Sequence, residues 1–354
     1  MRQHPSRYCA AIAAALTLAW ASQIEATQAL AQNVPEIPIE PVEGFIKLPE
    51  GLYLGEGIGV AENSQGHIFV YTRSQDTRLF EFDENGNYVR EIGAGLYGFE
   101  FAHKVRIDKD DNIWAVDEGS NQVIKFNPEG RVTMVLGYRP PAVDGALAPE
   151  PADKWGRSGG PGANEPYLFA RPTDVTWDTE GNIFVSDGYF NHRVVKYSPD
   201  GRFLGQVGSG QRGGEPDQFS TPHTIASDNQ GNIYVGDRGN RRVKVYNSDL
   251  ELLAMYEDTG APWEICISEG EHQYLFVSNS NSDSNPAASW DISGEVYKME
   301  LDGTIIGKFG EAGKGAGQFQ TIHGMSCRNP NELIVAEISA WRVQKILVAS
   351  EPVF

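Results

Sequence analysis

The stretch that decides the fold is FARPTDVTWDTEGNIFVSDGYFNHRVVKYSPDGRFLGQVG, residues 169–208. It contains four short runs rich in Val, Ile and aromatic residues, separated by turn signals such as EGN and PDG. A similar unit, FSTPHTIASDNQGNIYVGDRGNRRVKVYNSDLELLAMYE, begins at Phe219. Four such runs joined by tight turns predict a four-stranded antiparallel meander, and repeats of about 40–50 residues are typical of propeller blades.

The first run of this unit recurs six times along the chain. The copies are GIGVAEN, AHKVRID, PTDVTWD, PHTIASD, PWEICIS and IHGMSCR, beginning at Gly57, Ala102, Pro172, Pro222, Pro262 and Ile322. The sixth copy has only three strand-like runs, and one unpaired run, GFIKLP (44–49), precedes the first copy. We therefore expect an all-β fold, a single six-bladed β-propeller in which the N-terminal run 44–49 completes the last blade. Such closure leaves no long sheet edge unpaired.

The expected organisation is a signal peptide over residues 1–31, an extended lead-in over 32–43, the propeller over 44–348 and a short tail over 349–354. Arg2 and Arg7 precede an apolar run that is too short to span a bilayer, and Ala29-Leu30-Ala31 fits a small-residue cleavage site. This pattern predicts a periplasmic or secreted protein with cleavage near Ala31. Two insertions, 138–168 and 279–293, are expected to form loops on a face of the propeller.

The charge balance limits the partners. The 354 residues include 29 Lys and Arg against 48 Asp and Glu, which gives a net charge of −19. This argues against nucleic acid or an anionic membrane as partner, and no later segment is long and apolar enough to cross a bilayer. A monomer is expected. Cys266 and Cys327 lie in apolar strand patterns, so two buried free thiols are expected, although an oxidising compartment would permit a disulfide.

A column of histidines is the main candidate site. The second residue of the six aligned runs is, in order, Ile58, His103, Thr173, His223, Trp263 and His323. The histidines occupy alternate blades, which lie about 120° apart in a six-bladed ring, so three imidazoles should converge on the channel axis. Three neutral imidazoles with an open fourth position make a catalytic Zn²⁺ site, although another first-row metal also fits. The alternative is three unrelated histidines that donate to backbone carbonyls.

A second column is acidic and consists of Asp117, Asp187, Asp237 and Glu337. Because it recurs in most blades, we expect these side chains to cap loops through backbone N–H groups rather than to do chemistry. Two of the loops differ from the others. Arg73 lies one place after the column in the first blade, and the loop of the third blade is one residue longer and carries Tyr189. We expect both side chains to overhang one mouth of the channel. No site role is expected for His67, His192 or His272.

These motifs resemble the NHL-repeat propellers of the peptidyl-α-hydroxyglycine α-amidating lyase family and its bacterial relatives. The resemblance rests on PTDV followed by SDGY, on FSTPHTIASD and on the histidine column, and it covers residues 57–348. It implies Zn²⁺ held by His103, His223 and His323, a base at Tyr189 and an arginine that serves the site at Arg73. The implied reaction cleaves a small-molecule or peptide-derived N-(α-hydroxyalkyl)amide, bound in the central channel, into an amide and a carbonyl product.

The sequence departs from the family at three positions. Phe190 replaces a disulfide-bonded cysteine, Thr321 replaces a methionine that lines the site, and Gly324 replaces a carboxylate that helps to hold a structural Ca²⁺. The metal and the base are expected to remain, whereas Ca²⁺ is in doubt. Two other functions are compatible with the fold. One is a non-catalytic propeller that binds a protein or glycan, and the other is a metal-dependent hydrolase such as a lactonase, although the channel column lacks its usual carboxylate and Asn ligands.

Overall fold

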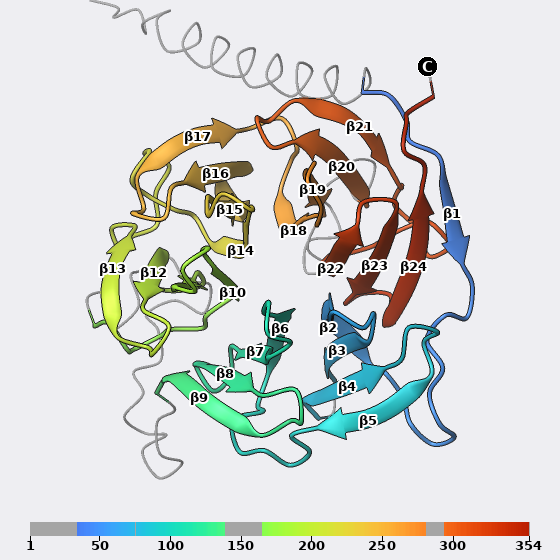
Figure 1. The fold of residues 1–354 in the computed structure, drawn as a ribbon. Coiled ribbons are helices and arrows are strands. Elements are labelled where there is room, and N and C mark those ends of the chain that lie inside the picture. Colours follow the sequence, from blue (N-terminus) through green and yellow to red (C-terminus); the bar gives the residue numbers. More distant parts are fainter. Residues whose placement is uncertain (1–33, 75, 139–164, 281–293, 354) are drawn as a thin grey trace, which may run out of the picture.

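The computed structural model describes residues 34–74, 76–138, 165–280 and 294–353. Within them the chain forms six four-stranded antiparallel sheets arranged around a central axis (Figure 1). The predicted all-β, six-bladed propeller is therefore confirmed. The signal peptide expected over residues 1–31 and most of the two expected insertion loops lie outside the described residues.

In the first three blades the strands follow one another from the axis outward (Figure 1). The first blade consists of β2 (Glu56–Glu62), β3 (Ile68–Arg73), β4 (Arg78–Phe82) and β5 (Tyr88–Ile92). The second consists of β6 (Ala102–Ile107), β7 (Ile113–Asp117), β8 (Gln122–Phe126) and β9 (Val132–Gly137). The third consists of β10 (Asp174–Trp177), β11 (Ile183–Asp187), β12 (Arg193–Tyr197) and β13 (Phe203–Val207).

The last three blades repeat this order until the ring closes. The fourth consists of β14 (Pro222–Ser227), β15 (Ile233–Asp237), β16 (Arg242–Tyr246) and β17 (Leu252–Tyr256), with the short 3₁₀ helix η2 (Arg238–Asn240) between β15 and β16. The fifth consists of β18 (Pro262–Ile267), β19 (Tyr274–Asn279), β20 (Glu295–Glu300) and β21 (Ile305–Phe309). The sixth consists of β22 (Ile322–Asn329), β23 (Glu332–Glu337), β24 (Arg342–Val348) and, at its outer edge, β1 (Ile39–Val42).

The turn between the two inner strands of a blade has a local cause. In the third blade, Asp178 Oδ1 accepts hydrogen bonds from the backbone N–H groups of Glu180 and Asn182, at 3.0 and 2.9 Å. Gly181 takes a φ of +81°, which a residue with a Cβ rarely adopts. The carboxylate thus replaces the ladder partners that the chain loses as it reverses. The aspartates of the second and fourth blades make the same pair of bonds.

The hydrophobic core is divided into six clusters, and each lies between two neighbouring blades. One joins the first and second blades through residues such as Tyr71 and Phe126, and another joins the sixth and first through residues such as Ile334 and Phe80. The other four clusters fill the remaining interfaces in the same way. Apolar packing therefore joins each blade mainly to its two neighbours, and the innermost strands are left to line the axis.

The ring closes through a different N-terminal strand from the one expected. β1 pairs with β24 in antiparallel register, with Ile39 opposite Val348 and Val42 opposite Lys345. The closing strand therefore lies in the segment 32–43 that was expected to be only a lead-in, and the expected run 44–49 was wrong. That run instead passes beside the first blade, where Lys47 bridges Asn87. The prolines obscured the strand. Proline is tolerated there because β1 is an edge strand and bonds through one side only.

The acidic column caps loops, as predicted. Asp117 Oδ2 accepts from the backbone N–H groups of Glu100 and Phe101, both at 2.9 Å, and Oδ1 accepts from that of Ser120 at 2.7 Å. The column residues of the third, fourth and sixth blades each accept from at least one backbone N–H in the same way. Repetition of these residues therefore has a structural cause.

Candidate metal centre and active site

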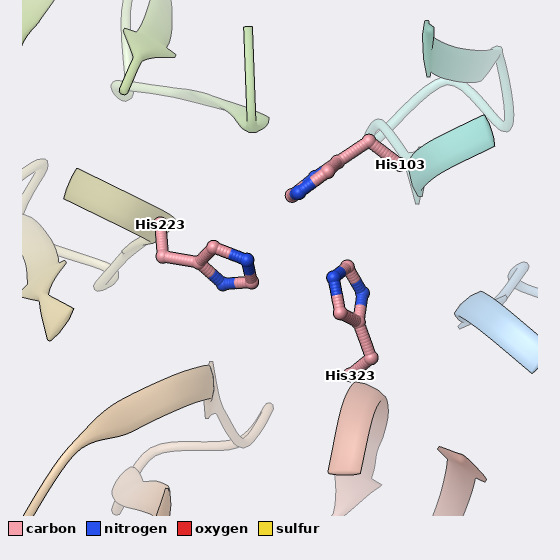
Figure 2. A group of neighbouring side chains, drawn as sticks. All are labelled: His103, His223 and His323. Carbon is pink, nitrogen blue, oxygen red and sulfur yellow. The ribbon is translucent and has the colours of Figure 1, made fainter. Parts of the chain in front are cut away.

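Three histidines meet on the channel axis (Figure 2). His103 comes from β6, His223 from β14 and His323 from β22. Their ring centroids lie 4.8, 4.7 and 4.8 Å apart, so the rings form a nearly equilateral triangle. One ligand atom from each residue lies within 4.8 Å of the others, and all three side chains are buried. The predicted convergence of alternate blades is confirmed.

Each histidine is oriented by the blade that follows it. The Nδ1 atom of His103 donates to the carbonyl of Thr173 at 2.5 Å. In the same way His223 donates to Trp263 at 2.7 Å, and His323 donates to Ile58 at 2.9 Å. The three acceptors are the column residues of the odd-numbered blades. The histidine column therefore alternates between candidate metal ligands and residues whose carbonyls fix the imidazole rings. Because Nδ1 is used in these bonds, Nε2 of each ring is the atom available to a metal on the channel axis.

The protonation state suits a metal. Burial lowers the pKa of all three histidines well below the ordinary imidazole value, and nearby positive groups lower it further. The rings are thus neutral at neutral pH, with a lone pair on the nitrogen that carries no proton. Three neutral nitrogens, each on a ring held by an outer hydrogen bond, are the donor set of a catalytic zinc site. The residues therefore fit Zn²⁺, or another first-row divalent ion. The alternative, in which the histidines only donate to backbone carbonyls, explains one nitrogen of each ring and leaves the other without a role.

Tyr189 covers this triad. Its hydroxyl lies 3.2 Å from Nε2 of His103 and 3.2 Å from Nε2 of His223. The extra residue of the third-blade loop makes this reach possible, since Asn191 and Arg193 still bond to Asp187 as Asn240 and Arg242 bond to Asp237 in the fourth blade. The added length is thus confined to residues 188–190. Gly188 lies against the Pro222 carbonyl, where a Cβ would clash, so the loop can approach the next blade closely.

The surroundings of Tyr189 pull its acidity in two directions. Burial raises the pKa of the phenol above its ordinary value, and the Glu118 carboxylate raises it further. The guanidinium groups of Arg238, Arg171 and Arg73 act in the opposite direction. Two of them lie over the ring, with the Cζ of Arg171 at 4.8 Å and that of Arg238 at 5.5 Å from its centroid. Positive charge therefore surrounds the position where a tyrosinate would form.

Arg73 lies near the same mouth, and its hydrogen bonds go to groups other than Tyr189. Its Nε donates to Glu56 at 2.9 Å, and its Nη1 donates to the Ala102 carbonyl at 3.2 Å and to Glu118 at 3.1 Å. The guanidinium also lies over the ring of Phe101, at 3.9 Å. Besides its electrostatic effect on the pKa of Tyr189, Arg73 is linked to this residue through Glu118, because Glu118 also binds Arg171 at 2.9 Å and Arg171 lies over the tyrosine ring.

Three residues of the site were missed from the sequence: Glu118, Arg171 and Arg238. Glu118 is 2% exposed, and its Oε2 has no hydrogen-bond partner among the described residues. The same is true of Nη1 of Arg238, which lies over the ring of Trp263 at 4.2 Å. A signal was available, since Glu118 and Arg238 follow the acidic column directly, as Arg73 follows Thr72. Aligning the blades at the position after the acidic column, as was done for Arg73, would have identified Glu118 and Arg238.

The remaining histidines lie outside the triad, as predicted. His67 pairs with Glu81 at 2.7 Å, and His272 pairs with Glu300 at 3.0 Å on the surface. His192 is buried at the start of β12, where its Nδ1 accepts from the backbone N–H of Thr221 at 3.4 Å. None of the three reaches the channel axis.

The residues present do not fit the Ca²⁺ site of the family. A Cβ at Gly324 would lie 2.8 Å from Cα of Gly59 and 2.8 Å from the backbone nitrogen of Val60, so no carboxylate can stand at this position without a shift of the main chain. The carbonyl of His323, one residue earlier, already accepts from the Lys104 ammonium at 2.6 Å. The Lys104 ammonium thus occupies this carbonyl oxygen, which would otherwise be available as a ligand to Ca²⁺.

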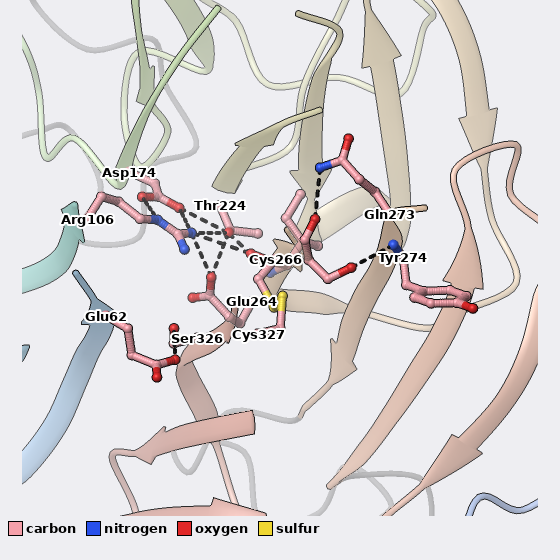
Figure 3. Close-up of a disulfide and its surroundings, with 12 residues drawn as sticks. Glu62, Arg106, Asp174, Thr224, Glu264, Cys266, Gln273, Tyr274, Ser326 and Cys327 are labelled. Atoms are coloured by element: carbon pink, nitrogen blue, oxygen red, sulfur yellow. Dashed lines mark hydrogen bonds and ion pairs between the residues drawn. A yellow bond between two sulfur atoms is a disulfide. The ribbon is translucent and has the colours of Figure 1, made fainter. Parts of the chain in front are cut away.

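The opposite end of the channel holds a cavity of about 670 Å³, lined by residues such as Trp114, Trp177 and Arg328. In its wall, Cys266 of β18 and Cys327 of β22 form a disulfide between neighbouring inner strands (Figure 3). The expectation of free thiols was therefore wrong. The two cysteines are 61 residues apart in sequence, and the ring brings their strands side by side.

Among the residues that the structure describes, no helix has the length and apolar character needed to cross a membrane.

Comparison with known proteins supports the resemblance. The NHL repeat family model matches residues 219–246. The chain is 26% identical over 325 residues to a probable peptidyl-α-hydroxyglycine α-amidating lyase of Caenorhabditis elegans, and the match covers 83% of each protein. It is 27% identical over 271 residues to the peptidyl-α-hydroxyglycine α-amidating lyase 1 of Drosophila melanogaster, covering 70% of this chain and 45% of the fly protein. The peptidylglycine α-amidating monooxygenase of Rattus norvegicus is 32% identical over 158 residues, and this match covers 43% of the chain and 14% of the rat protein.

Solved structures show the same fold at low identity. A virginiamycin B lyase of Staphylococcus aureus superposes with a TM-score of 0.53 at 12% identity, covering 89% of this chain and 100% of the other. A gluconolactonase of Xanthomonas campestris gives a TM-score of 0.55 at 14% identity, covering 89% and 99%. These likenesses concern the propeller alone. Over most of its length the chain is similar to proteins named as peptidyl-α-hydroxyglycine α-amidating lyases, so the resemblance inferred from the PTDV, SDGY and histidine motifs is confirmed.

Proposed function

We propose that this protein is a zinc-dependent lyase that cleaves an N-(α-hydroxyalkyl)amide, or a related carbinol, into an amide and a carbonyl product. The observation that carries the proposal is the contact between Tyr189 and the histidine triad. A phenol hydroxyl 3.2 Å from two candidate ligand nitrogens places an acid–base group directly beside a candidate metal. The similarity to amidating lyases over most of the chain supports the same reaction class.

His103, His223 and His323 would hold the ion. Zn²⁺ bound there would supply Lewis acidity, which lowers the pKa of oxygen acids placed beside it, the substrate hydroxyl included. The protein contributes the geometry. The three backbone carbonyls fix the imidazole rings before any ligand arrives, so little reorganisation is needed at binding.

Tyr189 would act as the base. In its tyrosinate form the phenolic oxygen takes the proton of the substrate hydroxyl, and the O–H electron pair becomes the second bond of the new carbonyl. The C–N bond breaks, its electron pair stays on the amide nitrogen, and that nitrogen takes up a proton to give the amide. Arg171 and Arg238, which lie over the ring, stabilise the tyrosinate electrostatically.

A substrate carboxylate has a binding partner at the channel mouth. Arg73 was expected to serve the site, but its guanidinium is already bonded to Glu56 and Glu118. Arg238 keeps Nη1 without a hydrogen-bond partner among the described residues, so we assign Arg238 the carboxylate and Arg73 a role in the charge cluster around Glu118.

Export is part of the proposal. The expected cleavable leader supports it, and so does the Cys266–Cys327 disulfide, because disulfides persist in oxidising compartments.

The test combines metal analysis with turnover. Purified protein is expected to contain about one equivalent of zinc, in line with the one three-histidine donor set among the described residues. It should convert α-hydroxyhippurate into benzamide and glyoxylate in equal amounts. Metal-free protein that binds no added zinc would refute the metal centre. A zinc-loaded protein that cleaves neither α-hydroxyhippurate nor other α-hydroxylated amides would refute the lyase and leave a binding propeller.

A further inference from the structure

A cluster of four charged side chains lies between the histidine triad and the opposite cavity; three of them are buried, and the fourth, Arg106, is 14% exposed and lines the cavity. Lys104 and Arg106 come from β6, Asp174 from β10 and Glu264 from β18. Arg106 is bonded to Asp174 through Nε at 2.9 Å and Nη2 at 2.5 Å, and its Nη2 also donates to Glu264 at 2.7 Å (Figure 3). Lys104 forms an ion pair with the other oxygen of Glu264.

The charges in this cluster balance, two against two. Asp174 also accepts from neutral donors. Thr224 donates to Asp174 at 3.0 Å, as does the backbone N–H of Ile225 at 3.0 Å. Buried ions are tolerated when each is paired and hydrogen-bonded in this way. The Lys104 ammonium therefore has a fixed place on the axis and is not a solvated group.

Lys104 also reaches the candidate metal centre. Its Nζ donates to the main-chain carbonyl of His323 at 2.6 Å, and it is 1% exposed. One strand thus contributes twice to the triad, because His103 is a ligand candidate and the next side chain holds the backbone of another. Through Lys104 and Glu264, the second, fifth and sixth blades are tied together directly beneath the histidines.

We propose that Lys104 is a positioning residue for the metal centre: held by Glu264, its ammonium fixes the main chain of His323 so that the three imidazoles meet without a structural Ca²⁺. This rests on the metal site of the proposed function. The ammonium contributes the cross-link between blades that a bound cation on the axis would otherwise make, since it offers donors to one carboxylate and one carbonyl from different blades.

The experiment measures zinc affinity by competition with a chromophoric chelator, together with thermal unfolding, in Lys104→Met, Lys104→Met/Glu264→Gln and Lys244→Met. The last variant is the matched control. Lys244 is also a buried lysine that donates to two main-chain carbonyls, those of Pro216 and Gln218 at 2.8 and 2.6 Å, but these bonds go to the loop between β13 and β14 rather than to the triad.

Loss of the ammonium is expected to weaken zinc binding about 10-fold or more, as the loss of an outer-shell partner typically does. Lys104→Met alone leaves Glu264 paired only with Arg106 and gives the cluster one excess negative charge, which should lower its melting temperature. The double variant removes that carboxylate charge and should recover stability without recovering zinc affinity. Lys244→Met should lower the melting temperature and keep wild-type affinity. Addition of Ca²⁺ should leave the melting temperature of the wild type unchanged.

Wild-type zinc affinity in the double variant would overturn the positioning role, as would a melting temperature of the wild type that rises with Ca²⁺. A wild-type protein that binds zinc but has no lyase activity would refute the proposed reaction while leaving this inference to be judged by affinity. A wild type that binds no zinc would refute both.

Discussion

The two ends of the central channel are built from the same six inner strands, yet they differ in how closely they follow the repeat. At the cavity end, the aspartates that close the turns of the second, third and fourth blades make the same backbone bonds in each blade. At the histidine end, the histidine column alternates in residue type along the blades. The position after the acidic column varies from arginine to glutamate, and the loop that carries Tyr189 is one residue longer than the others. Repeated residues at this propeller hold the fold, and departures from the repeat gather where a ligand is expected.

The strongest way to break this comparison is to remove two ligands from the histidine end. His103→Ala/His223→Ala is expected to abolish zinc binding and to lower turnover by roughly 10³-fold or more, since a metal contributes several kcal/mol of charge stabilisation. Zinc content and the rate on α-hydroxyhippurate measure this. His272→Ala, which removes an exposed imidazole, is the control and should change neither. Retained zinc in the double variant would disprove the triad as the site.

Tyr189 tests whether the longer loop is catalytic. Tyr189→Phe should keep the metal and lower kcat by roughly 10²–10⁴-fold, the range for loss of a general base. Tyr53→Phe, at an exposed tyrosine, serves as control. Both variants are compared by steady-state kinetics and metal analysis. Unchanged kcat in Tyr189→Phe would remove the phenol from the mechanism and reduce the extra residue to a packing feature.

Arg238 tests the position that follows the acidic column. If its free Nη1 holds the substrate carboxylate, Arg238→Gln should raise KM by roughly 10–100-fold, the equivalent of one charged hydrogen bond. With an amide substrate of the same size that lacks the carboxylate, wild type and Arg238→Gln should have similar KM values. Arg202→Gln, at an exposed arginine, is the control. Equal KM in wild type and Arg238→Gln would place the carboxylate elsewhere.

Acid should destabilise the metal-free protein through the same histidines. Because burial lowers their folded pKa values, the unfolded chain binds more protons once the pH drops below the ordinary imidazole value of about 6.5. This contribution to stability should be fully present above about pH 6.5 and decline below it, by at most about 4 kcal/mol per pH unit for three groups. Urea unfolding at several pH values measures the slope. A triple His→Gln variant should show a flatter profile, and an identical one would contradict the prediction.

The smallest effect is expected at the cavity end. Asp178→Ala removes the acceptor of two backbone N–H groups in a turn and should cost about 1–3 kcal/mol of stability. It should leave kcat unchanged below the melting temperature, because the turn lies at the far end of the third blade. Asp249→Ala, at an exposed turn position, is the control for stability. A large loss of kcat in Asp178→Ala would show that the two ends are not independent.

Much of the architecture was predictable because each blade carries its own signal. Strand periodicity and the Asp-based turns are local, and the histidine column follows from simple alignment of the repeats. The closing strand was misplaced because the prolines of residues 35–41 read as an irregular lead-in, and their tolerance depends on an edge position that only the assembled ring defines. The disulfide was missed because the pairing of Cys266 with Cys327 also depends on the assembled ring, which brings their strands side by side. The two cysteines do occupy nearly equivalent places in neighbouring aligned runs.

The site was predictable at its centre and less so at its rim. Alternation along one column placed the three imidazoles, and a length change marked Tyr189. The links of Arg73 to Glu118, and of Lys104 to Glu264 and the His323 carbonyl, join different blades. No local pattern reports such contacts, because they depend on which side chains face one another across the channel.

The hydrogen bond from His323 to the Ile58 carbonyl has a consequence for biogenesis. It joins a ligand candidate near the end of the chain to a blade synthesised near the start. A polypeptide that is still emerging from the ribosome, or still crossing a membrane in unfolded form, thus holds at most two of its three imidazoles in place. If the triad binds zinc as proposed, it can be loaded only after the whole ring has formed, and zinc content would then report how much of a preparation has completed folding.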